Sequence, residues 1–281
     1  MAVALVTGGT SGIGRATAER FLASGWHVVV ADVNAEAGRT LLDESGAPDG
    51  RLLFAEADVA EERDVEAAVR TAVDGFGRLD CMVNNAGVGG AFGPITEIEV
   101  ADWDYTFGVL VRGVFLGTKH AARAMRRHGD GGSIVNVASV AGLVGGAAPQ
   151  AYSAAKAAVI QLTRVTAAEL GPFRIRVNAV APGVVRTPLV EMGKRDVDEA
   201  LAGVQPWPGV APAPQVAGVI EFLAGPEAEF VTGETVAVDG GLVAAGIRLG
   251  DAVGGNPALR GLVGVNRGST GAPSSVHRTA D

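Results

Sequence analysis

The chain has 281 residues, 48% of them hydrophobic and 41 of them glycine, and its net charge is −8 at pH 7. A chain of this length can bury a full core, and the composition favours a buried parallel sheet with many tight turns. The negative charge argues against nucleic acid and other polyanionic partners. No apolar run reaches the roughly 18–20 residues that span a bilayer, so no membrane segment is expected.

The amino-terminal segment and the cysteine content indicate a cytoplasmic protein. The stretch "MAVALVTGG" has no basic region before its apolar run and leads into a predicted strand, unlike a signal peptide. Cys81, the single cysteine, permits no internal disulfide. It lies in the apolar run "LDCMV", which favours a buried structural thiol over a reactive one. The four histidines show no ligand spacing with cysteines or carboxylates, so no metal site is expected.

Short apolar runs alternate with amphipathic stretches along the chain. The runs predict strands at residues 2–7, 27–32, 51–58, 79–85, 132–139, 174–182 and 234–241. Helical patterns between them include residues 12–24, 61–75, 102–128, 151–170 and 213–224. This alternation predicts an α/β fold with a single doubly wound, Rossmann-type parallel sheet of seven strands and helices on both faces. Right-handed crossovers would place the ligand crevice at the carboxyl ends of the strands.

Two segments interrupt this alternation. Residues 186–214 are proline-rich and loop-like, and they follow the sixth predicted strand, where a lid over the crevice would lie. Residues 248–281 are rich in glycine and small polar residues, which is typical of a mobile tail. That tail carries four arginines and two aspartates, hence +2, whereas residues 1–247 carry −10, so docking on an acidic neighbouring surface is the alternative. We expect a domain over 1–247 followed by an extension over 248–281.

The first glycine-rich turn predicts a dinucleotide site. "TGGTSGIG", residues 7–14, directly follows the first predicted strand and opens the first predicted helix. Glycines at such a junction allow a tight turn, and they let backbone N–H groups and the helix N-terminus approach a pyrophosphate. The residues of this turn expected to bind the cofactor are Gly8, Thr10, Ser11, Gly12, Ile13 and Gly14.

Asp32 ends the second predicted strand, eighteen residues after Gly14. A carboxylate at that position accepts hydrogen bonds from the adenosine ribose hydroxyls and repels the 2′-phosphate of NADP. The neighbours Ser11 and Val33 are not basic and offer that phosphate no cation. The position therefore favours NAD over NADP, and the alternative is a solvated acid at the end of a strand.

Three polar side chains suggest a catalytic site. In "YSAAK", Tyr152 and Lys156 lie one turn apart on the same face of a predicted helix. A cation so placed stabilises a phenolate and can lower the pKa of the tyrosine from its ordinary value of about 10. Ser139 ends the strand "SIVNVAS", where it could hydrogen-bond a substrate oxygen. The stretches "NNAG" (84–87) and "PGVVRT" (182–187) make the pattern more specific.

Together these motifs resemble those of the short-chain dehydrogenase/reductase family over residues 1 to about 245. The resemblance implies an NAD-dependent enzyme acting on CH–OH donors. Tyr152 would be the general base in oxidation, Lys156 would hold the nicotinamide ribose, and Ser139 would orient the substrate oxygen. It also implies further cofactor contacts: Val33, Asp58 (at the adenine amino group), Val59, Asn85, Ala86, Gly87, Pro182, Gly183, Val184, Val185 and Thr187. Family members are usually homotetramers assembled through helices corresponding to 102–128 and 151–170, and a dimer is the alternative.

The chain departs from the family pattern in "FGVLVRGVF", residues 107–115, where Leu110 occupies the position of the family's catalytic asparagine. In the family this residue lies at a helix irregularity, and its main-chain carbonyl helps to hold a water that links the lysine to solvent. A leucine side chain forms no hydrogen bond, but the residue still supplies a carbonyl. The leucine places the local helix irregularity in doubt, so we expect a working enzyme with a slower relay. The alternative is an NAD(H)-binding scaffold or sensor with impaired catalysis.

The side chains expected to face the substrate are mostly apolar, which favours a hydrophobic alcohol or ketone. They are Val88, Ala91, Phe92, Leu143, Val144, Leu189, Met192 and Trp207. The sequence most resembles family members acting on cyclic secondary alcohols, while Arg186 and Lys194 keep a clamp for a carboxylate or phosphate open. A 3-oxoacyl-carrier-protein-type reductase is a second alternative. Such an enzyme would use NADPH and would need a basic surface to bind its acidic carrier. Asp32 opposes the first requirement and the net charge of −8 opposes the second.

Overall fold

A computed structural model describes residues 1–47, 50–191, 205–246, 262–265, 267 and 275–278. The chain divides into two compact units, Met1–Val243 and Ala244–Asp281. The first unit ends four residues before the boundary predicted for the domain. Among the described residues, no helix is long and apolar enough to cross a membrane.

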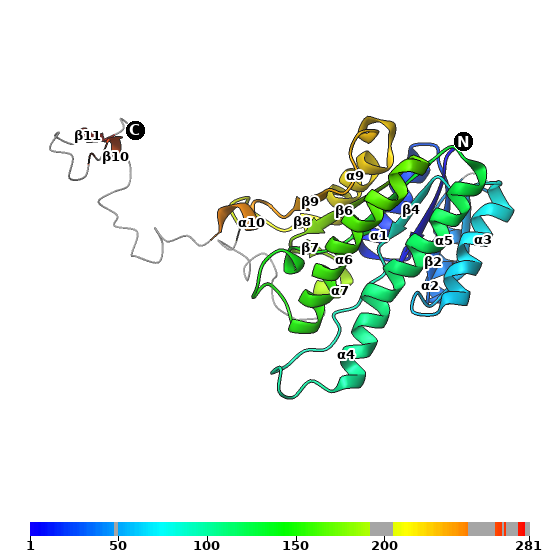
Figure 1. Cartoon of the computed structure of the whole chain (residues 1–281), viewed down its shortest axis with the longest axis horizontal. Helices are drawn as coiled ribbons and strands as arrows, with labels where there is room; N and C mark the ends of the chain where they lie inside the picture. Colours follow the sequence, from blue (N-terminus) through cyan, green and yellow to red (C-terminus); the bar gives the residue numbers. More distant parts are fainter. Residues whose placement is uncertain (48–49, 192–204, 247–261, 266, 268–274, 279–281) are drawn as a thin grey trace. The chain divides into compact units, whose positions relative to one another are not determined.

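The first unit is built on a parallel seven-stranded sheet, as predicted (Figure 1). Its strands are β1 (Val3–Thr7), β2 (His27–Asp32), β3 (Leu52–Glu56), β4 (Cys81–Asn84), β5 (Gly132–Val137), β6 (Ile175–Pro182) and β9 (Thr235–Val238). The order is β3-β2-β1-β4-β5-β6-β9, and all neighbours pair in parallel. The chain moves outward from β1 in one direction and from β4 in the other. A crevice is therefore expected at the carboxyl ends of β1 and β4.

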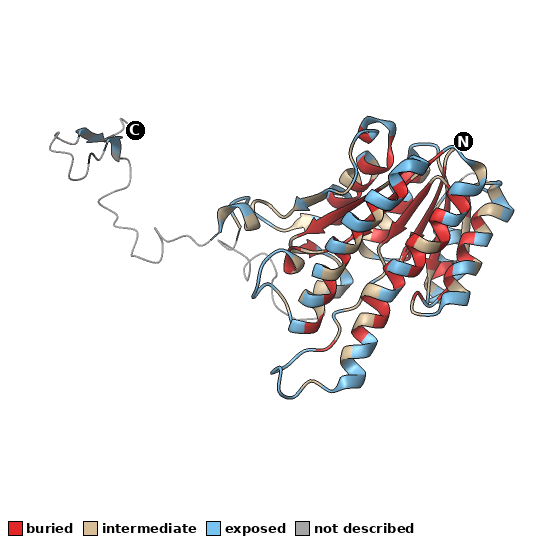
Figure 2. Ribbon diagram, in the orientation of Figure 1, coloured by how far each residue is buried: buried red, intermediate tan, exposed pale blue. Residues whose placement is uncertain are grey.

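Helices cover both faces of this sheet. They are α1 (Gly12–Ala23), α2 (Ala35–Glu44), α3 (Glu62–Phe76), α4 (Val100–Phe107), α5 (Gly113–His128), α6 (Gln150–Leu170), α9 (Ala213–Ala224) and the short η2 (Val140–Gly142), η3 (Gly171–Phe173) and η4 (Pro226–Ala228). Helix α2 is not among the helices named from the sequence pattern. Successive β1 residues enter opposite cores, since Leu5 packs with α3, α5 and α6 whereas Val6 packs with α1 and α9. Buried residues accordingly fill the strands and the inner helix faces (Figure 2).

The helix predicted over residues 102–128 contains a π-helical turn. This turn, η1 (Gly108–Arg112), separates α4 from α5, and Leu110 stands at its centre with its side chain fully buried. Such turns are rare and are frequent at functional sites. The helix irregularity that the leucine placed in doubt is therefore present with leucine in the sequence.

Additional short elements lie in or next to the two segments that broke the sequence pattern. In the proline-rich segment, β7 (Val185–Arg186) pairs in parallel with β8 (Ala211–Pro212), and α7 (Pro188–Glu191) follows β7, while 192–204 lie outside the described residues. Helix α10 (Leu242–Ala245) follows β9. In the second unit, β10 (Leu262–Val265) pairs antiparallel with β11 (Ser275–Arg278). The sequence did not predict this pair of strands, because a four-residue strand in a glycine-rich sequence shows little alternation of apolar and polar residues.

Cys81 lies on β4 inside the sheet and is fully buried. Burial raises the pKa of its thiol to about 12, so the thiol stays protonated at neutral pH. The expectation of a buried structural cysteine is confirmed.

Candidate active site

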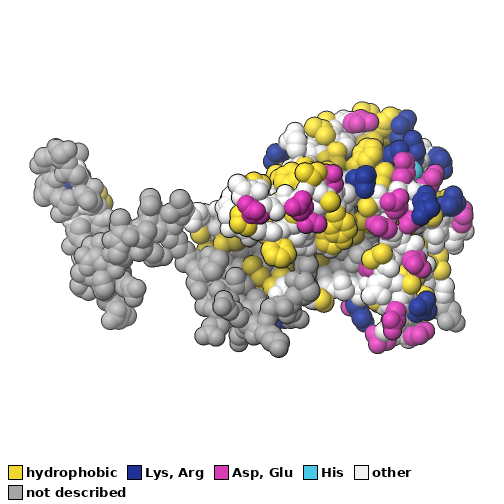
Figure 3. All heavy atoms as spheres, turned by 90° about the horizontal axis from the view of Figure 1, so that it is seen from below, with side chains coloured by type: hydrophobic (Ala, Val, Ile, Leu, Met, Phe, Trp, Pro, Cys, Tyr) yellow, Lys and Arg dark blue, Asp and Glu magenta, His cyan; other side chains and the backbone are white. Residues whose placement is uncertain are grey.

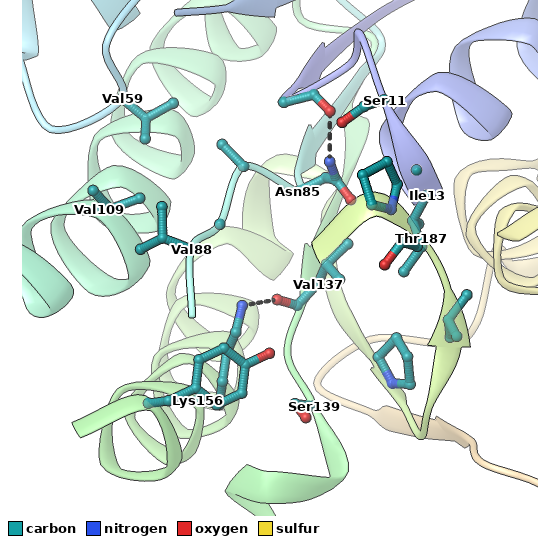
Figure 4. Close-up of a pocket in the computed structure, with 18 of the residues that line it drawn as sticks. Ser11, Ile13, Val59, Asn85, Val88, Val109, Val137, Ser139, Lys156 and Thr187 are labelled. Carbon is teal, nitrogen blue, oxygen red and sulfur yellow. Dashed lines mark hydrogen bonds between the residues drawn. The ribbon is translucent and has the colours of Figure 1, made fainter. Parts of the chain in front are cut away.

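A cleft of about 360 Å³ opens where the strands end. Segments that follow β1, β2, β3, β4, β5 and β6 line it, and α4, η1, α6 and α7 complete its walls (Figure 4). It gathers most of the sequence-predicted site residues: Gly8, Ser11, Gly12, Ile13, Asp32, Val33, Asp58, Val59, Asn85, Ala86, Gly87, Ser139, Tyr152, Lys156, Pro182, Gly183, Val185 and Thr187. Thr10, Gly14 and Val184 lie outside this lining as the structure describes it.

The turn after β1 packs closely on the segment after β4. A Cβ atom at Gly8, whose φ is +62°, would lie 2.7 Å from Ala86 Cα. A Cβ at Gly14 would lie 2.1 Å from the Gly8 carbonyl oxygen, so only glycine fits there. Helix α1 begins at Gly12, and the preceding Ser11 side chain makes no capping bond to described residues, which leaves backbone N–H groups free. This cradle fits the pyrophosphate of a dinucleotide.

Side-chain hydrogen bonds fasten the same two segments together. The Thr7 hydroxyl oxygen accepts from the backbone N–H groups of Asn85 at 3.0 Å and Ala86 at 3.1 Å. In return, Asn85 Nδ2 donates to the carbonyl oxygens of Thr7 at 2.9 Å and Gly8 at 3.1 Å. Hydrogen bonds within the chain thus fasten the floor of the cleft.

Asp32 is held by the same turn. Its Oδ2 accepts from Thr10 N at 3.1 Å and from Thr10 Oγ1 at 2.6 Å. Its Oδ1 accepts from Asn34 N at 3.0 Å. Asp32 lines the cleft, whereas Thr10 is buried behind it, so the threonine supports the carboxylate.

Three polar residues converge at the other end of the cleft. Ser139 follows β5 and caps η2, accepting from Ala141 N at 3.1 Å. Tyr152 and Lys156 project from α6, and Lys156 Nζ lies 5.6 Å from the centre of the tyrosine ring. Lys156 Nζ donates to the Val137 carbonyl oxygen at 2.7 Å, the bond drawn in Figure 4.

Burial dominates the electrostatics of this end. It lowers the pKa of Lys156 from 10.5 to about 8, because desolvation disfavours the ammonium. Burial also raises the pKa of Tyr152, and a hydrogen bond donated by Ser139 to the phenolate partly offsets this rise. The spacing of Tyr152 and Lys156 on one helix predicts a lowered tyrosine pKa. Packing around the ring produces the opposite direction, since the phenolate loses more water than its partners replace.

Leu110 forms an apolar wall beside the lysine. It packs in a buried cluster with Val59, Leu116 and Ala155, and Tyr152 borders that cluster. A Cβ atom at Gly87 would lie 3.4 Å from Leu110 Cδ2 and 4.0 Å from Lys156 Nζ. The leucine and the lysine therefore both border Gly87, on the floor of the cleft.

Among the described lining residues, seven were not anticipated from the sequence: Ala57, Tyr105, Val109, Val137, Ala138, Pro188 and Val190. Tyr105 on α4 and Val109 in the π-helical turn are four residues apart, the spacing of one helix face. That spacing was available in the sequence. The others lie within two residues of a predicted site residue along the chain.

The residues expected to face the substrate are only partly brought together. Val88 lines the cleft, whereas Phe92 and Trp207 are 83% and 71% exposed and stand apart from the described lining. Ala91 is buried, with its N–H bonded to Thr106. Leu143, Val144 and Arg186 also lie apart from the lining. Met192, Lys194 and the side chain of Leu189 lie outside the described residues.

No group of three or more His, Cys, Asp or Glu side chains able to hold a metal ion occurs within the described part of the chain. Ser139, Tyr152 and Lys156 bring a hydroxyl, a phenol and an ammonium group to one end of the cleft.

Residues 8–243 match a family model described as enoyl-(acyl carrier protein) reductase. Levodione reductase of Leifsonia aquatica is 40% identical over 254 residues, covering 86% of this chain and 94% of that protein. Cis-4-hydroxycyclohexanecarboxylate dehydrogenase of Sinomonas cyclohexanicum is 43% identical over 244 residues, covering 86% and 96%.

Solved structures agree with these relatives. The crystal structure of a short-chain type dehydrogenase/reductase from Mycobacterium marinum has a TM-score of 0.81 at 32% identity, covering 86% of this chain and 95% of that chain. ElxO with NADP bound has a TM-score of 0.80 at 31% identity, covering 86% and 99%. The family match ends at residue 243, the last residue of the first compact unit.

Proposed function

The chain belongs to the short-chain dehydrogenase/reductase family, and on that premise we propose that it is an NAD-dependent dehydrogenase interconverting an apolar, cyclic secondary alcohol and its ketone. The observation that carries this proposal is the joint placement of Ser139, Tyr152 and Lys156 at one end of a cleft whose other end is the glycine cradle with Asp32.

The protein's groups can manage the proton and orient the substrate. Tyr152 is the group that takes the proton from the substrate hydroxyl during oxidation, and Ser139 hydrogen-bonds the same oxygen. Lys156, whose Nζ lies 5.6 Å from the centre of the Tyr152 ring, stabilises the phenolate while the lysine is protonated. The nicotinamide cofactor, when bound, supplies the hydride acceptor. Since burial raises the pKa of Tyr152, oxidation should accelerate as the pH rises into the alkaline range.

The preference for NAD rests on Asp32. Its carboxylate faces the cleft at the end of β2, where the adenosine ribose of a dinucleotide lies in this fold. A 2′-phosphate would meet this negative charge, and the adjacent lining residues Ser11 and Val33 provide no cation. One structural neighbour binds NADP, so the cofactor must be measured rather than assigned by likeness.

The apolar character of the substrate rests on the walls near the catalytic groups. Val88, Val109 and Val190 line the cleft, and Lys156 is the one cationic side chain among the described lining residues. A site built this way favours a hydrophobic alcohol. The cyclic class is supported by the relative named for a hydroxycyclohexanecarboxylate.

A homo-oligomer, a tetramer or dimer, is also proposed. Helices α5 and α6 border a groove of about 250 Å³ lined by Phe115, Leu162 and Leu170 together with charged residues. Phe115 and Val165 are exposed on these helices, an apolar surface that self-association would cover. Sedimentation velocity would test this, and a monomer at micromolar concentration would contradict it.

A second candidate is a reductase of carrier-protein-linked acyl groups, favoured by the description of the matching family model. Such a carrier is acidic, and this chain also has a negative net charge of −8, which disfavours their association. Acidic and basic side chains are interspersed over the right-hand end of the face shown in Figure 3. Faster oxidation of NADPH with a 3-oxoacyl thioester than reduction of NAD with any alcohol would favour this candidate.

The decisive experiment is the initial rate of NADH formation from NAD with a panel of cyclic and aryl secondary alcohols at pH 9, for the wild type and Tyr152→Phe. We expect turnover by the wild type and a loss of about 10²–10⁴-fold in the variant, with NADH affinity nearly unchanged. Tight NADH binding without turnover of any alcohol or ketone would instead support the scaffold alternative.

A further inference from the structure

The contact between Thr10 and Asp32 joins two segments of the cleft that are 22 residues apart. Thr10 belongs to the turn after β1, and Asp32 is the last residue of β2. The threonine is 8% exposed, and both its backbone N–H and its hydroxyl donate to one oxygen, Asp32 Oδ2. A hydrogen bond of 2.6 Å from a hydroxyl to a carboxylate has the short length of a charge-assisted bond.

The acceptor positions of Asp32 are nearly all taken by the protein. An ionised carboxylate offers about four lone-pair positions, two on each oxygen. Thr10 fills both positions on Oδ2, and Asn34 N fills one on Oδ1 among the described residues. One position on Oδ1 is left, and Asp32 lines the cleft. The carboxylate can therefore accept from one further donor without breaking a bond it already has.

We propose that Thr10 is the positioning residue for cofactor selectivity: by holding Oδ2, it keeps the Asp32 carboxylate turned so that Oδ1 accepts from a ribose hydroxyl and a 2′-phosphate is repelled. This inference rests on the proposed preference for NAD and names the residue that sets its strength. Thr10 acts through Asp32, since it is buried behind that residue.

The physical reason is the rotational freedom of an aspartate. A carboxylate held by one bond can turn about its side-chain torsions and move its charge away from an incoming phosphate. Two bonds to Oδ2 from a turn that is itself packed against Ala86 remove this freedom. The charge then stays where the 2′ substituent lies, so the cost of binding NADPH cannot be relieved by rotation.

The test is a pair of dissociation constants, measured by fluorescence titration with NADH and with NADPH, which requires no knowledge of the substrate. In Thr10→Val the hydroxyl is replaced by a methyl group of similar size. We expect the ratio of the NADPH to the NADH dissociation constant to fall at least about fivefold, the effect of losing one hydrogen bond to a charged group. Thr10→Ser keeps the hydroxyl and should keep the ratio within about twofold of wild type.

Two further variants separate positioning from a general disturbance of the turn. Thr17→Val removes the hydroxyl of another buried threonine, which bonds to the Ile13 carbonyl oxygen and not to Asp32, and it should leave the ratio unchanged. Thr10→Val combined with Asp32→Ala should match Asp32→Ala alone, because a residue that acts through Asp32 has no effect once Asp32 is gone. If Thr10→Val does not fold, Thr10→Ala makes the same test with a smaller side chain.

The outcomes are distinct. A wild type that prefers NADH, with a ratio that Thr10→Val leaves unchanged, overturns this inference and leaves the proposed NAD preference standing. A wild type that binds NADPH as tightly as NADH overturns both. An effect of Thr10→Val on the ratio that persists in the Asp32→Ala background shows that Thr10 acts by another route and also overturns the inference.

Discussion

The two ends of the cleft achieve order in different ways. At the nucleotide end, hydrogen bonds within the protein hold Thr7, Asn85 and Asp32 before any ligand is considered. At the catalytic end, Lys156 donates to the Val137 carbonyl oxygen, and both it and the apolar Leu110 border Gly87. Polar order shapes one end, whereas desolvation tunes the other. Cofactor binding at the nucleotide end should therefore depend most on individual hydrogen bonds. Turnover at the catalytic end should depend most on the burial and charge of its side chains.

The largest expected effect is on turnover when the buried cation is removed. At pH 7, where Lys156 with its pKa of about 8 is charged, Lys156→Met should lower kcat about 10²–10⁴-fold, because the phenolate of Tyr152 loses the cation beside its ring. Steady-state kinetics with the best alcohol of the panel measures this. Retention of more than a tenth of wild-type kcat would show that the lysine is dispensable for the proton transfer.

The same variant should change the pH dependence of stability. The pKa of Lys156 is about 8 in the fold against an ordinary 10.5, so the unfolded chain holds this proton more strongly. The burial penalty of about 3 kcal/mol is fully present below pH 8 and disappears as the pH rises to 10.5. Urea unfolding of wild type and Lys156→Met at pH 7, 9 and 10.5 measures it. The stability advantage of the variant should shrink with rising pH, and a constant difference would contradict the lowered pKa.

A smaller effect is expected at the nucleotide end. Thr7→Val removes the acceptor of the Asn85 and Ala86 N–H groups and should cost about 1–3 kcal/mol of unfolding free energy. It should weaken NADH binding while leaving kcat at saturating cofactor near wild type. The control is Thr71→Val, whose hydroxyl bonds to the Ala67 carbonyl on α3, with an expected change within about 0.5 kcal/mol. Equal losses in both variants would refute the special role of Thr7.

The smallest effect on turnover is expected from Leu110→Asn. The π-helical turn is present with leucine, so asparagine is not required for this backbone and kcat should change less than about threefold. Stability should fall by about 1–3 kcal/mol, because the amide enters an apolar cluster. Initial rates and urea unfolding measure the two effects. A tenfold gain in kcat would show that leucine restrains the enzyme.

Several features could be predicted from the sequence because their signals are local. The seven strands follow from short apolar runs, and the phosphate cradle follows from glycines placed between a strand and a helix. Tyr152 and Lys156 lie close together because they are four residues apart on one helix. In each case a few consecutive residues carry the whole physical argument.

Other features were decided by contacts between distant segments. The support of Asp32 by Thr10, the pairing of β7 with β8, and the place of Tyr105 in the cleft each require the folded chain. The direction of the Tyr152 pKa also lay beyond the sequence. Spacing on a helix says which charge is near, whereas the water that a side chain loses depends on everything packed around it. Local pattern therefore determined which chemical groups this protein brings to the cleft, and tertiary packing alone decided how strongly each is held and solvated.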